Sequence, residues 1–356
     1  MNILLTSSAR RIDFVDFFND ALRNVGTKGK VIVADPEQNA PSLQTGDESY
    51  VIPHQTDPRF IDEILEICKK QKVDCLVPLN DLEVPIISAH KDELEQLGIS
   101  VFAPDLPVVN KVRDKGKYRE LLKSFDVMAP LSYINVEDAK KALYDKEVSF
   151  PLIVKPRNGS ASIGIEFVHS VKGMKVAYDH AVKEIIETSL NDATYKKPED
   201  NVIIQEVIEG DKFSVDMFND LEGNHLASFV RKQLAMRGGD VDRTITVNEP
   251  ELQAIAERTG ENLGHAGYMN ADVYYDGMNY YVIDINPRFG GGYSFTHNAG
   301  ANIPAAIIAL TAGIEVKEDW LTQDSDIELA RHDVVVPINL QKVKDINKAL
   351  LDRQEG

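Results

Sequence analysis

The chain has 356 residues, which is too long for one ordinary hydrophobic core and predicts two or three domains. Its 43% hydrophobic and 27% charged residues are typical of a globular protein, and its formal net charge of −18 argues against nucleic-acid or anionic-membrane partners. Only two cysteines occur, Cys68 and Cys75, which excludes a disulfide framework and favours a reducing compartment.

The N-terminal sequence MNILLTSSARR has its apolar residues first and its charged residues after them, the reverse of a secretory signal peptide. No stretch approaches the roughly 18 apolar residues that a membrane span requires. We therefore expect a cytoplasmic protein.

The first hundred residues alternate between strand-like and helix-like segments. Strands are expected at Asn2–Thr6, Lys30–Ala34, Val73–Pro78 and Ile99–Ala103, and helices at Ile12–Asn24, Asp57–Lys70 and Val84–Leu97. Repeating βα units predict an open parallel sheet, which binds ligands at the carboxyl ends of its strands, here Ser7–Arg11, Asp35 and Asn80–Glu83. Thr6–Ala9 contains no glycine, so the dinucleotide fingerprint is absent and a dehydrogenase is discounted.

After Val112 strands and helices no longer alternate strictly, which suggests α+β domains. Helices are expected at Val112–Ser124, Val136–Lys146, Val171–Ser189 and Pro250–Leu263. Strands are expected at Ala129–Ile134, Leu152–Lys155, Ile165–His169, Val202–Val207, Phe213–Phe218, His225–Val230, Met269–Tyr275 and Asn279–Ile285, and loops at Asn191–Asn201 and Met236–Asp242.

The segment DINPRFGGG leaves the last of these strands with an acid, an amide and an arginine at Asp284, Asn286 and Arg288. The dipeptide Asp276-Gly277 predicts a hairpin before it; a loop of Asp276–Tyr280 would set Asp272 opposite Asp284, and a tighter turn would offset them by about three positions.

The carboxylate and amide oxygens of Asp272, Asp284 and Asn286 suit Mg²⁺. In proteins Mg²⁺ is usually bound by one or two carboxylates together with phosphate oxygens of a substrate, so this cluster predicts a bound nucleotide. The alternative is a pair of acids that end solvent-facing strands. The three glycines that follow, Gly290–Gly292, are expected to let the backbone approach a substrate.

A second motif is PLIVKPRNGSASIGI, in which a buried apolar strand delivers Lys155 to a loop containing Ser160, Ser162 and Gly164. Small residues let backbone N–H groups close over phosphate oxygens, while the lysine supplies a fixed positive charge. Taken alone, such a hairpin is more often a simple turn. The apolar strand before Glu206 and Ile208 is a third, weaker signal, whose linker could pair with an adenine edge.

In their order and spacing these motifs resemble the ATP-grasp superfamily, most closely the ATP-grasp half of the carbamoyl phosphate synthase large subunit, over roughly residues 2–313. The resemblance implies an α/β N-terminal open parallel sheet, the pre-ATP-grasp domain, at residues 1–108. Two α+β ATP-grasp subdomains would follow at 109–208 and 209–320, with a C-terminal extension at 321–356.

The resemblance also implies ATP and Mg²⁺ (or Mn²⁺) as cofactors. Lys115 and Lys155 would hold ATP phosphates under a flap at 158–164, and Glu206 and Ile208 would meet adenine. Asp272, Asp284 and Asn286 would hold the metal, and Arg288 would steady the transferred phosphoryl group.

The chain departs from the family pattern at three places. Both metal acids are Asp where Glu is usual, and the flap is richer in Ser and Ala than in glycine. Lys212 stands where a ribose-binding Glu is usual, and Asp211 or Glu209 is the candidate to replace that Glu.

Two further residues are candidates for the acceptor substrate. Arg237, on a glycine-flexed loop, could clamp a carboxylate, or it is a solvated loop arginine. His297 could line the acceptor pocket, or it is a packed helix histidine.

The function expected from the resemblance is a ligase that activates a carboxylate as an acyl-phosphate for attack by an amine, with an amino acid or peptide-like acid as substrate. One alternative is a carboxyphosphate- or carbamate-forming module that needs a partner, and another is an ATP-binding module without turnover. The expected partners are small-molecule carboxylates and amines, with a homodimer as a common family assembly, and no nucleic acid or membrane.

Overall fold

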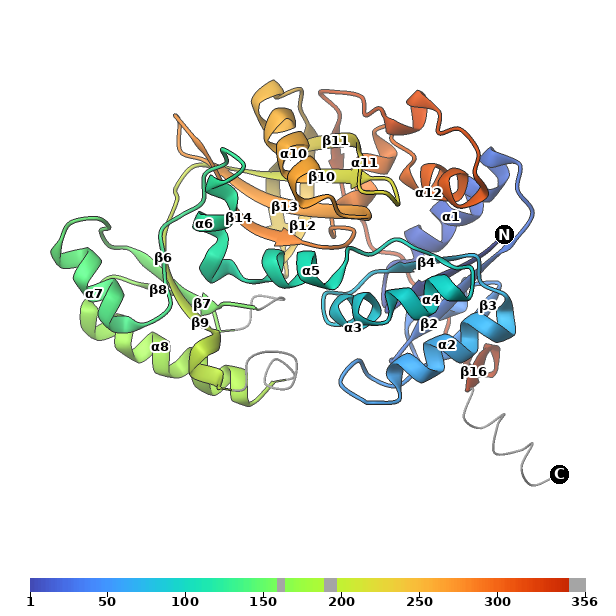
Figure 1. Cartoon of the computed structure of the whole chain (residues 1–356), viewed down its shortest axis with the longest axis horizontal. Helices are drawn as coiled ribbons and strands as arrows, with labels where there is room; N and C mark the ends of the chain where they lie inside the picture. Colours follow the sequence, from blue (N-terminus) through green and yellow to red (C-terminus); the bar gives the residue numbers. More distant parts are fainter. Residues whose placement is uncertain (159–163, 189–196, 346–356) are drawn as a thin grey trace.

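The computed structural model describes residues 1–158, 164–188 and 197–345, which form three β-sheets with helices packed around them (Figure 1). The first sheet is parallel throughout, in the order β16-β3-β2-β1-β4-β5. Its strands are β1 (Asn2–Thr6), β2 (Lys30–Asp35), β3 (Glu48–Val51), β4 (Cys75–Pro78), β5 (Ser100–Val101) and β16 (Val343–Asp345). The open parallel sheet expected from the sequence is confirmed.

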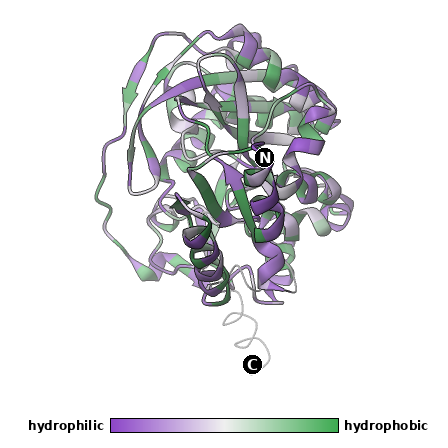
Figure 2. Cartoon of the chain, turned by 90° about the vertical axis from the view of Figure 1, so that its left-hand side faces the viewer, coloured by the Kyte–Doolittle hydropathy of each residue, from purple (hydrophilic) through white to green (hydrophobic). Residues whose placement is uncertain are grey.

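Four helices flank this sheet: α1 (Ile12–Val25), α2 (Phe60–Gln71), α3 (Val84–Ala89) and α4 (Lys91–Gln96). Their apolar residues pack with those of the strands in two buried clusters. Figure 2 colours the chain by hydropathy and shows hydrophobic and hydrophilic residues interspersed along the helices. The single helix predicted for Val84–Leu97 is wrong, because His90 has non-helical backbone angles and separates α3 from α4.

The second sheet is antiparallel, in the order β6-β9-β7-β8. Its strands are β6 (Ser132–Tyr133), β7 (Leu152–Pro156), β8 (Glu166–Val168) and β9 (Val202–Glu206), and it shares one core with α7 (Val136–Tyr144) and α8 (Val171–Ile186). This unit lies at the left of Figure 1.

The third sheet is also antiparallel, in the order β14-β13-β10-β11-β12-β15. Its strands are β10 (Asp211–Asn219), β11 (His225–Arg237), β12 (Asp240–Thr246), β13 (Gly267–Tyr275), β14 (Tyr280–Asn286) and β15 (Glu328–Ala330). Helix α10 (Pro250–Leu263) packs against one face, and α11 (Tyr293–Asn298) and α12 (Ile303–Ala312) join the core that contains α1. The fold class, a parallel sheet followed by two α+β units, is confirmed.

Two further local predictions are wrong. The helix predicted for Val112–Ser124 is broken into α5 (Leu106–Arg113), a 3₁₀ turn at Lys115–Lys117 and α6 (Tyr118–Lys123), because the Asp114 side chain accepts a hydrogen bond from the Gly116 backbone N–H and ends α5.

The loop predicted for Met236–Asp242 is instead a tight hairpin between β11 and β12. Gly238 and Gly239 both have positive φ, at 59° and 82°, which a two-residue turn of this kind requires. Glycine at both positions was the signal in the sequence for this turn.

The division of the chain at residues 108, 208 and 320 stays a prediction. Within the described ranges, no helix combines the length and the apolar character that crossing a bilayer would need.

Candidate active site

One face of the third sheet carries the polar side chains of the candidate site. Lys212 and Ser214 on β10 share this face with Gln233 on β11 and with Asp272 on β13, because these positions alternate along their strands and stand opposite or diagonal to one another. The other face carries apolar residues that pack with α10. The alternation therefore directs the charges to one side and the core to the other.

Asp272 and Asp284 stand opposite each other in the pairing of β13 with β14. The connecting turn is one residue shorter than a loop of Asp276–Tyr280, because Tyr275 pairs with Tyr280. A bulge at Ile283 adds one residue to β14, so that Asp272 and Asp284 still stand opposite each other. The hairpin prediction is correct in its result, and the bulge is the feature that the sequence did not indicate.

Each of these carboxylates has a lysine beside it. Lys115 Nζ lies 2.7 Å from Asp284 Oδ1, and Lys212 Nζ lies 2.9 Å from Asp272 Oδ2. Burial alone would lower the pKa of Lys212, but the Asp272 carboxylate outweighs burial and raises that pKa above its usual value.

Lys155 is the last residue but one of β7 and is almost fully buried. Burial lowers its pKa to about 8, the positive charge of Lys115 adds to this decrease, and Asp284 opposes it. The second sheet thus brings a third ammonium group into the field of the two acids.

This low pKa predicts a pH-dependent nucleotide affinity. Above pH 8 the free Lys155 is mostly neutral, whereas a bound polyphosphate favours the ammonium form, so binding must take up a proton and weaken as pH rises, approaching about tenfold per pH unit. We expect calorimetric titration of MgADP between pH 7 and 9.5 to show this loss, with proton uptake revealed by buffers of different ionisation enthalpy. Lys155→Arg is the control, because arginine stays protonated and its MgADP affinity should not fall in this way. If the MgADP affinity of the unaltered protein does not change with pH, the assignment of Lys155 to the phosphates is contradicted.

The turn that presents Lys115 is held to the end of β7. Arg157 donates to both carboxylate oxygens of Asp114, at 2.5 and 2.7 Å, and the Lys115 backbone N–H donates to the Arg157 carbonyl at 3.3 Å. A Cβ on Gly116 would lie 2.8 Å from Arg157 Nε, so any larger residue would push this arginine away from Asp114. The sequence did not point to Asp114 or Arg157, which are 43 residues apart.

Arg288 contacts the carboxyl end of the first sheet. One of its guanidinium nitrogens donates to Asp81 Oδ2 at 2.5 Å and to Asn286 Oδ1 at 3.2 Å. Burial alone would raise the pKa of Asp81, but the charges of Arg288 and Arg113 outweigh it and hold the pKa below its usual value. Asp81, which follows β4, therefore links the first sheet to the DINPR segment.

The described residues fit Mg²⁺ only when other oxygens complete its ligand set. Asp284 Oδ1 is buried, and the partner that the described part of the chain offers it is the Lys115 ammonium at 2.7 Å. In that part, no three His, Cys, Asp or Glu side chains gather as a metal-binding group. Two facing aspartates and the Asn286 amide thus suit a cation that arrives with phosphate oxygens.

The three glycines after Arg288 lie close to protein side chains. A Cβ on Gly290 would lie 2.9 Å from Asn270 Oδ1, one on Gly291 2.5 Å from Asp240 Oδ1, and one on Gly292 2.1 Å from an Arg231 nitrogen. The glycines therefore make room for polar side chains of the third sheet, and their expected closeness to a substrate stays a prediction.

Beneath this loop, Arg231 and Asp216 form an ion pair in which both side chains are fully buried. Arg231 also donates to the Gly292 carbonyl at 2.5 Å, and Asp216 accepts from the Asn270 amide at 2.6 Å and the Thr296 hydroxyl at 3.2 Å. The network fastens the glycine segment to the sheet and was not found from the sequence.

The residues expected to bind adenine and ribose are placed as follows. The Glu206 backbone N–H donates to the Leu131 carbonyl at 2.9 Å, and Ile208 lies in the short connection from β9 to β10. Asp211 pairs with Lys232 at 2.7 Å, and Lys232 stands opposite Phe213 on the core side of the sheet. Asp211 thus points away from Lys212, and we do not assign it to the nucleotide.

The flap is only partly described. Ser160 and Ser162 lie outside the described residues, and Gly164 is at its end with a φ of 61°. Asn158, at its beginning, is held by Asn201, whose side chain accepts from the Asn158 backbone N–H at 2.8 Å.

The two candidate acceptor residues make protein contacts. Arg237 pairs with Asp242 at 2.8 Å and Asp333 at 2.7 Å, and His297 stacks on the Phe17 ring with centroids 3.7 Å apart. Burial lowers the pKa of His297 to about 4. For His297 these contacts match the packed-helix alternative.

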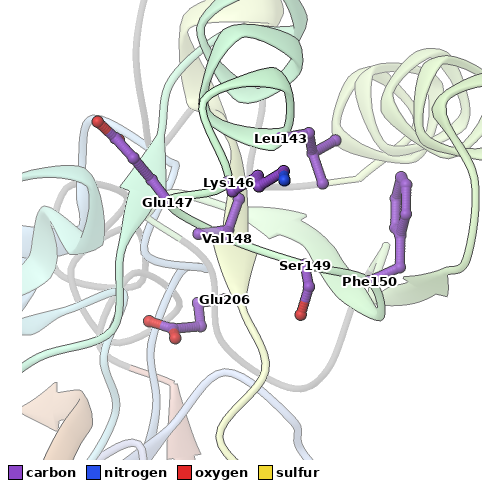
Figure 3. A pocket seen from close by; sticks show the side chains of 7 residues that line it. All are labelled: Leu143, Lys146, Glu147, Val148, Ser149, Phe150 and Glu206. Carbon is purple, nitrogen blue, oxygen red and sulfur yellow. The ribbon is translucent and has the colours of Figure 1, made fainter.

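A cavity of about 620 Å³ lies beside the end of β9 (Figure 3). Its lining residues are Leu143, Lys146, Glu147, Val148, Ser149, Phe150 and Glu206. None of the clustered aspartates or lysines lines it, whereas Glu206, one of the residues expected to meet adenine, does.

Two family models match the chain. Residues 3–102 match the PylC-like, N-terminal domain, and residues 198–334 match the family described as ATP-grasp in the biosynthetic pathway with Ter operon.

Curated relatives include carbamoyl phosphate synthase chains. The large chain from Clostridium acetobutylicum is 25% identical over 279 residues, which are 75% of this chain and 24% of that one. The carbamoyl-phosphate synthase of Methanobrevibacter smithii is 24% identical over 98% of this chain and 90% of its own. The chain therefore spans about a quarter of the first relative and most of the second.

Solved structures share the fold. The biotin carboxylase domain of Hydrogenobacter thermophilus 2-oxoglutarate carboxylase, a dimer in complex with MgADP, ADP and bicarbonate, has a TM-score of 0.71 at 18% identity over 92% of this chain and 73% of its own. The ADP complex of purK, N5-carboxyaminoimidazole ribonucleotide synthetase, has a TM-score of 0.67 at 16% identity over 92% of this chain and 79% of its own.

Proposed function

Because the chain is an ATP-grasp protein with a PylC-like N-terminal domain, we propose that it is an ADP-forming ligase that joins a carboxylate to an amine. The carboxylate would be an amino acid or a small peptide-like acid, and ADP and phosphate would be released. The observation that carries the proposal is the facing pair Asp272 and Asp284, surrounded by the ammonium groups of Lys115, Lys155 and Lys212.

In the first step a carboxylate oxygen of the substrate attacks the γ-phosphorus of ATP, the bond to the β-phosphate oxygen breaks, and ADP leaves. Lys115 and Lys155 are proposed to hold the phosphates through their ammonium groups. Asp272, Asp284 and Asn286 would hold Mg²⁺ or Mn²⁺, which supplies further neutralisation of phosphate charge. Catalysis of this kind depends on positioning and charge compensation rather than on a protein nucleophile.

In the second step the amine nitrogen attacks the carbonyl carbon of the acyl-phosphate, phosphate leaves, and the nitrogen loses a proton. We assign Arg288 to the departing phosphoryl group, since Asp81 and Asn286 fix its guanidinium beside the acids. Asp81 ties that arginine to the carboxyl ends of the first sheet, where an open parallel sheet binds its ligand.

A second candidate is supported by the relative from Methanobrevibacter smithii, a carbamoyl-phosphate synthase that matches this chain over nearly its whole length. In that case bicarbonate is the carboxylate and ammonia the amine. The chemistry of the first step and the roles of the lysines and aspartates are the same.

The test is Mg²⁺-dependent ADP release from ATP, measured with pooled amino acids and small carboxylic acids, and separately with bicarbonate and ammonia. Stimulation by one organic pool supports the ligase, and deconvolution identifies both substrates. Stimulation by bicarbonate with ammonia alone supports the second candidate. If a protein that still binds ATP releases no ADP with any of these substrates, both candidate functions are contradicted. The remaining function is that of a nucleotide-binding module without turnover.

A further inference from the structure

Lys212 occupies a position that the proposed chemistry does not explain. It stands on β10 where the family pattern has an acid, and its ammonium lies 2.9 Å from Asp272 Oδ2. The other oxygen of the same carboxylate accepts a hydrogen bond from the Gln233 amide at 3.1 Å, and that amide also donates to Ser214 at 2.9 Å. Both oxygens of Asp272 are therefore engaged by neighbours on its own sheet.

Asp284 is held differently. Its lysine, Lys115, belongs to the turn between α5 and α6 and not to the third sheet. Lys115 is also a proposed ligand of the phosphates, so a nucleotide competes with Asp284 for it. Lys212 is rigidly attached, because β10 and β13 are paired along their whole length. Lys212 lies two residues from Ser214, which stands opposite Asp272.

The charge balance of the cluster is unusual for a metal site. Three lysines, Lys115, Lys155 and Lys212, face two carboxylates, Asp272 and Asp284. Two carboxylates that face each other could otherwise hold a pair of divalent cations, as in two-metal phosphoryl-transfer sites. An ammonium fixed on one of them supplies a positive charge at that place and repels a second cation.

We infer that Lys212 is a built-in cation that takes the place of a second divalent ion, so that the site binds one Mg²⁺ per nucleotide and none without nucleotide. Asp284 and Asn286 would then hold this ion, while Asp272, which the proposed function counts among the metal-holding residues, stays paired with Lys212. This inference rests on the proposed function, since it concerns the same nucleotide site. Lys212 would act as a positioning residue for Asp272 while contributing the charge that a second metal would supply.

The test counts metal ions directly. Mn²⁺ is titrated into the full chain with a saturating non-hydrolysable ATP analogue, free Mn²⁺ is measured by electron paramagnetic resonance, and bound nucleotide is measured in the same samples. The unaltered protein is expected to bind one Mn²⁺ per nucleotide, and no Mn²⁺ when nucleotide is left out. Lys212→Gln keeps the length and a hydrogen-bonding end but removes the charge, and it is expected to bind a second Mn²⁺ at least about tenfold more tightly.

Two control variants separate charge from structure. Lys212→Arg keeps the positive charge and is expected to stay at one Mn²⁺. Lys232→Gln removes a lysine from the neighbouring strand, where it pairs with Asp211 on the opposite face, and is also expected to stay at one.

The outcomes are distinguishable. Two Mn²⁺ ions per nucleotide in the unaltered protein, or one in Lys212→Gln with unchanged affinity, would overturn the role of Lys212 and leave the ligase proposal standing. Failure of the unaltered protein to bind the nucleotide analogue would overturn both.

Discussion

Asp284→Asn is expected to lower Mg²⁺-dependent ADP formation by on the order of 10²–10³-fold, the effect of removing one preorganised charge-stabilising group. Asparagine has the same shape but no charge, so it no longer attracts a divalent cation and leaves Lys115, 2.7 Å away in the unaltered protein, without its carboxylate. The measurement is initial ADP release at saturating ATP over a range of Mg²⁺ concentrations.

The same assay separates this effect from misfolding. Glu222→Gln removes an exposed acid from the turn between β10 and β11 and is expected to release ADP at the normal rate. The circular dichroism spectrum of Asp284→Asn at the assay temperature should match that of the unaltered protein, which shows that the variant is folded although the loss of the Lys115 pair lowers its melting temperature. Near-normal ADP release by Asp284→Asn would reject the assignment of Asp284 to the metal.

Arg231→Met is expected to reduce the stability of the third sheet by about 3–5 kcal/mol, the usual consequence of removing one partner of a buried ion pair. Methionine leaves the Asp216 charge buried without its guanidinium partner. It also removes the hydrogen bond that Arg231 donates to the Gly292 carbonyl at 2.5 Å. The shift is measured as loss of hydrogen-exchange protection at the amides of β10 and β11 and as a lower urea midpoint.

The double variant Asp216→Leu with Arg231→Met decides whether the charge is responsible. Removing both charges together should recover a large part of the lost stability, because neither partner is then buried alone. A double variant as unstable as the sum of the two single changes would show that shape, rather than charge, dominates at this place.

The sequence predicts well where the pattern is local. The alternation of βα units indicated the parallel sheet, and Asp276-Gly277 indicated the hairpin that brings Asp272 opposite Asp284. Lys155 could be singled out because a lysine at the end of an apolar strand is a conspicuous local signal. The assignment of these side chains to phosphates and metal stays a prediction.

The contacts that orient the site join residues far apart in the chain. Asp81 and Arg288 are separated by 207 residues, and Arg231 and Gly292 by 61. The sequence placed Asp81 within the expected ligand-binding segment Asn80–Glu83, but it did not indicate the pair with Arg288, because that partner is specified only when the first sheet meets the third. The bulge at Ile283 escaped prediction for a related reason, since the pairing of both strands defines it.

Strand β16 has a consequence for the order in which the protein is made. Residues 343–345 pair in parallel with β3, whereas the other strands of that sheet all lie within the first 101 residues. While a ribosome is still synthesising the chain, the finished part of this sheet has β3 as an open edge with unpaired backbone groups. That edge is covered only after almost all of the remaining sequence has emerged, so the nascent protein passes through a long interval in which β3 is open to pairing with another chain.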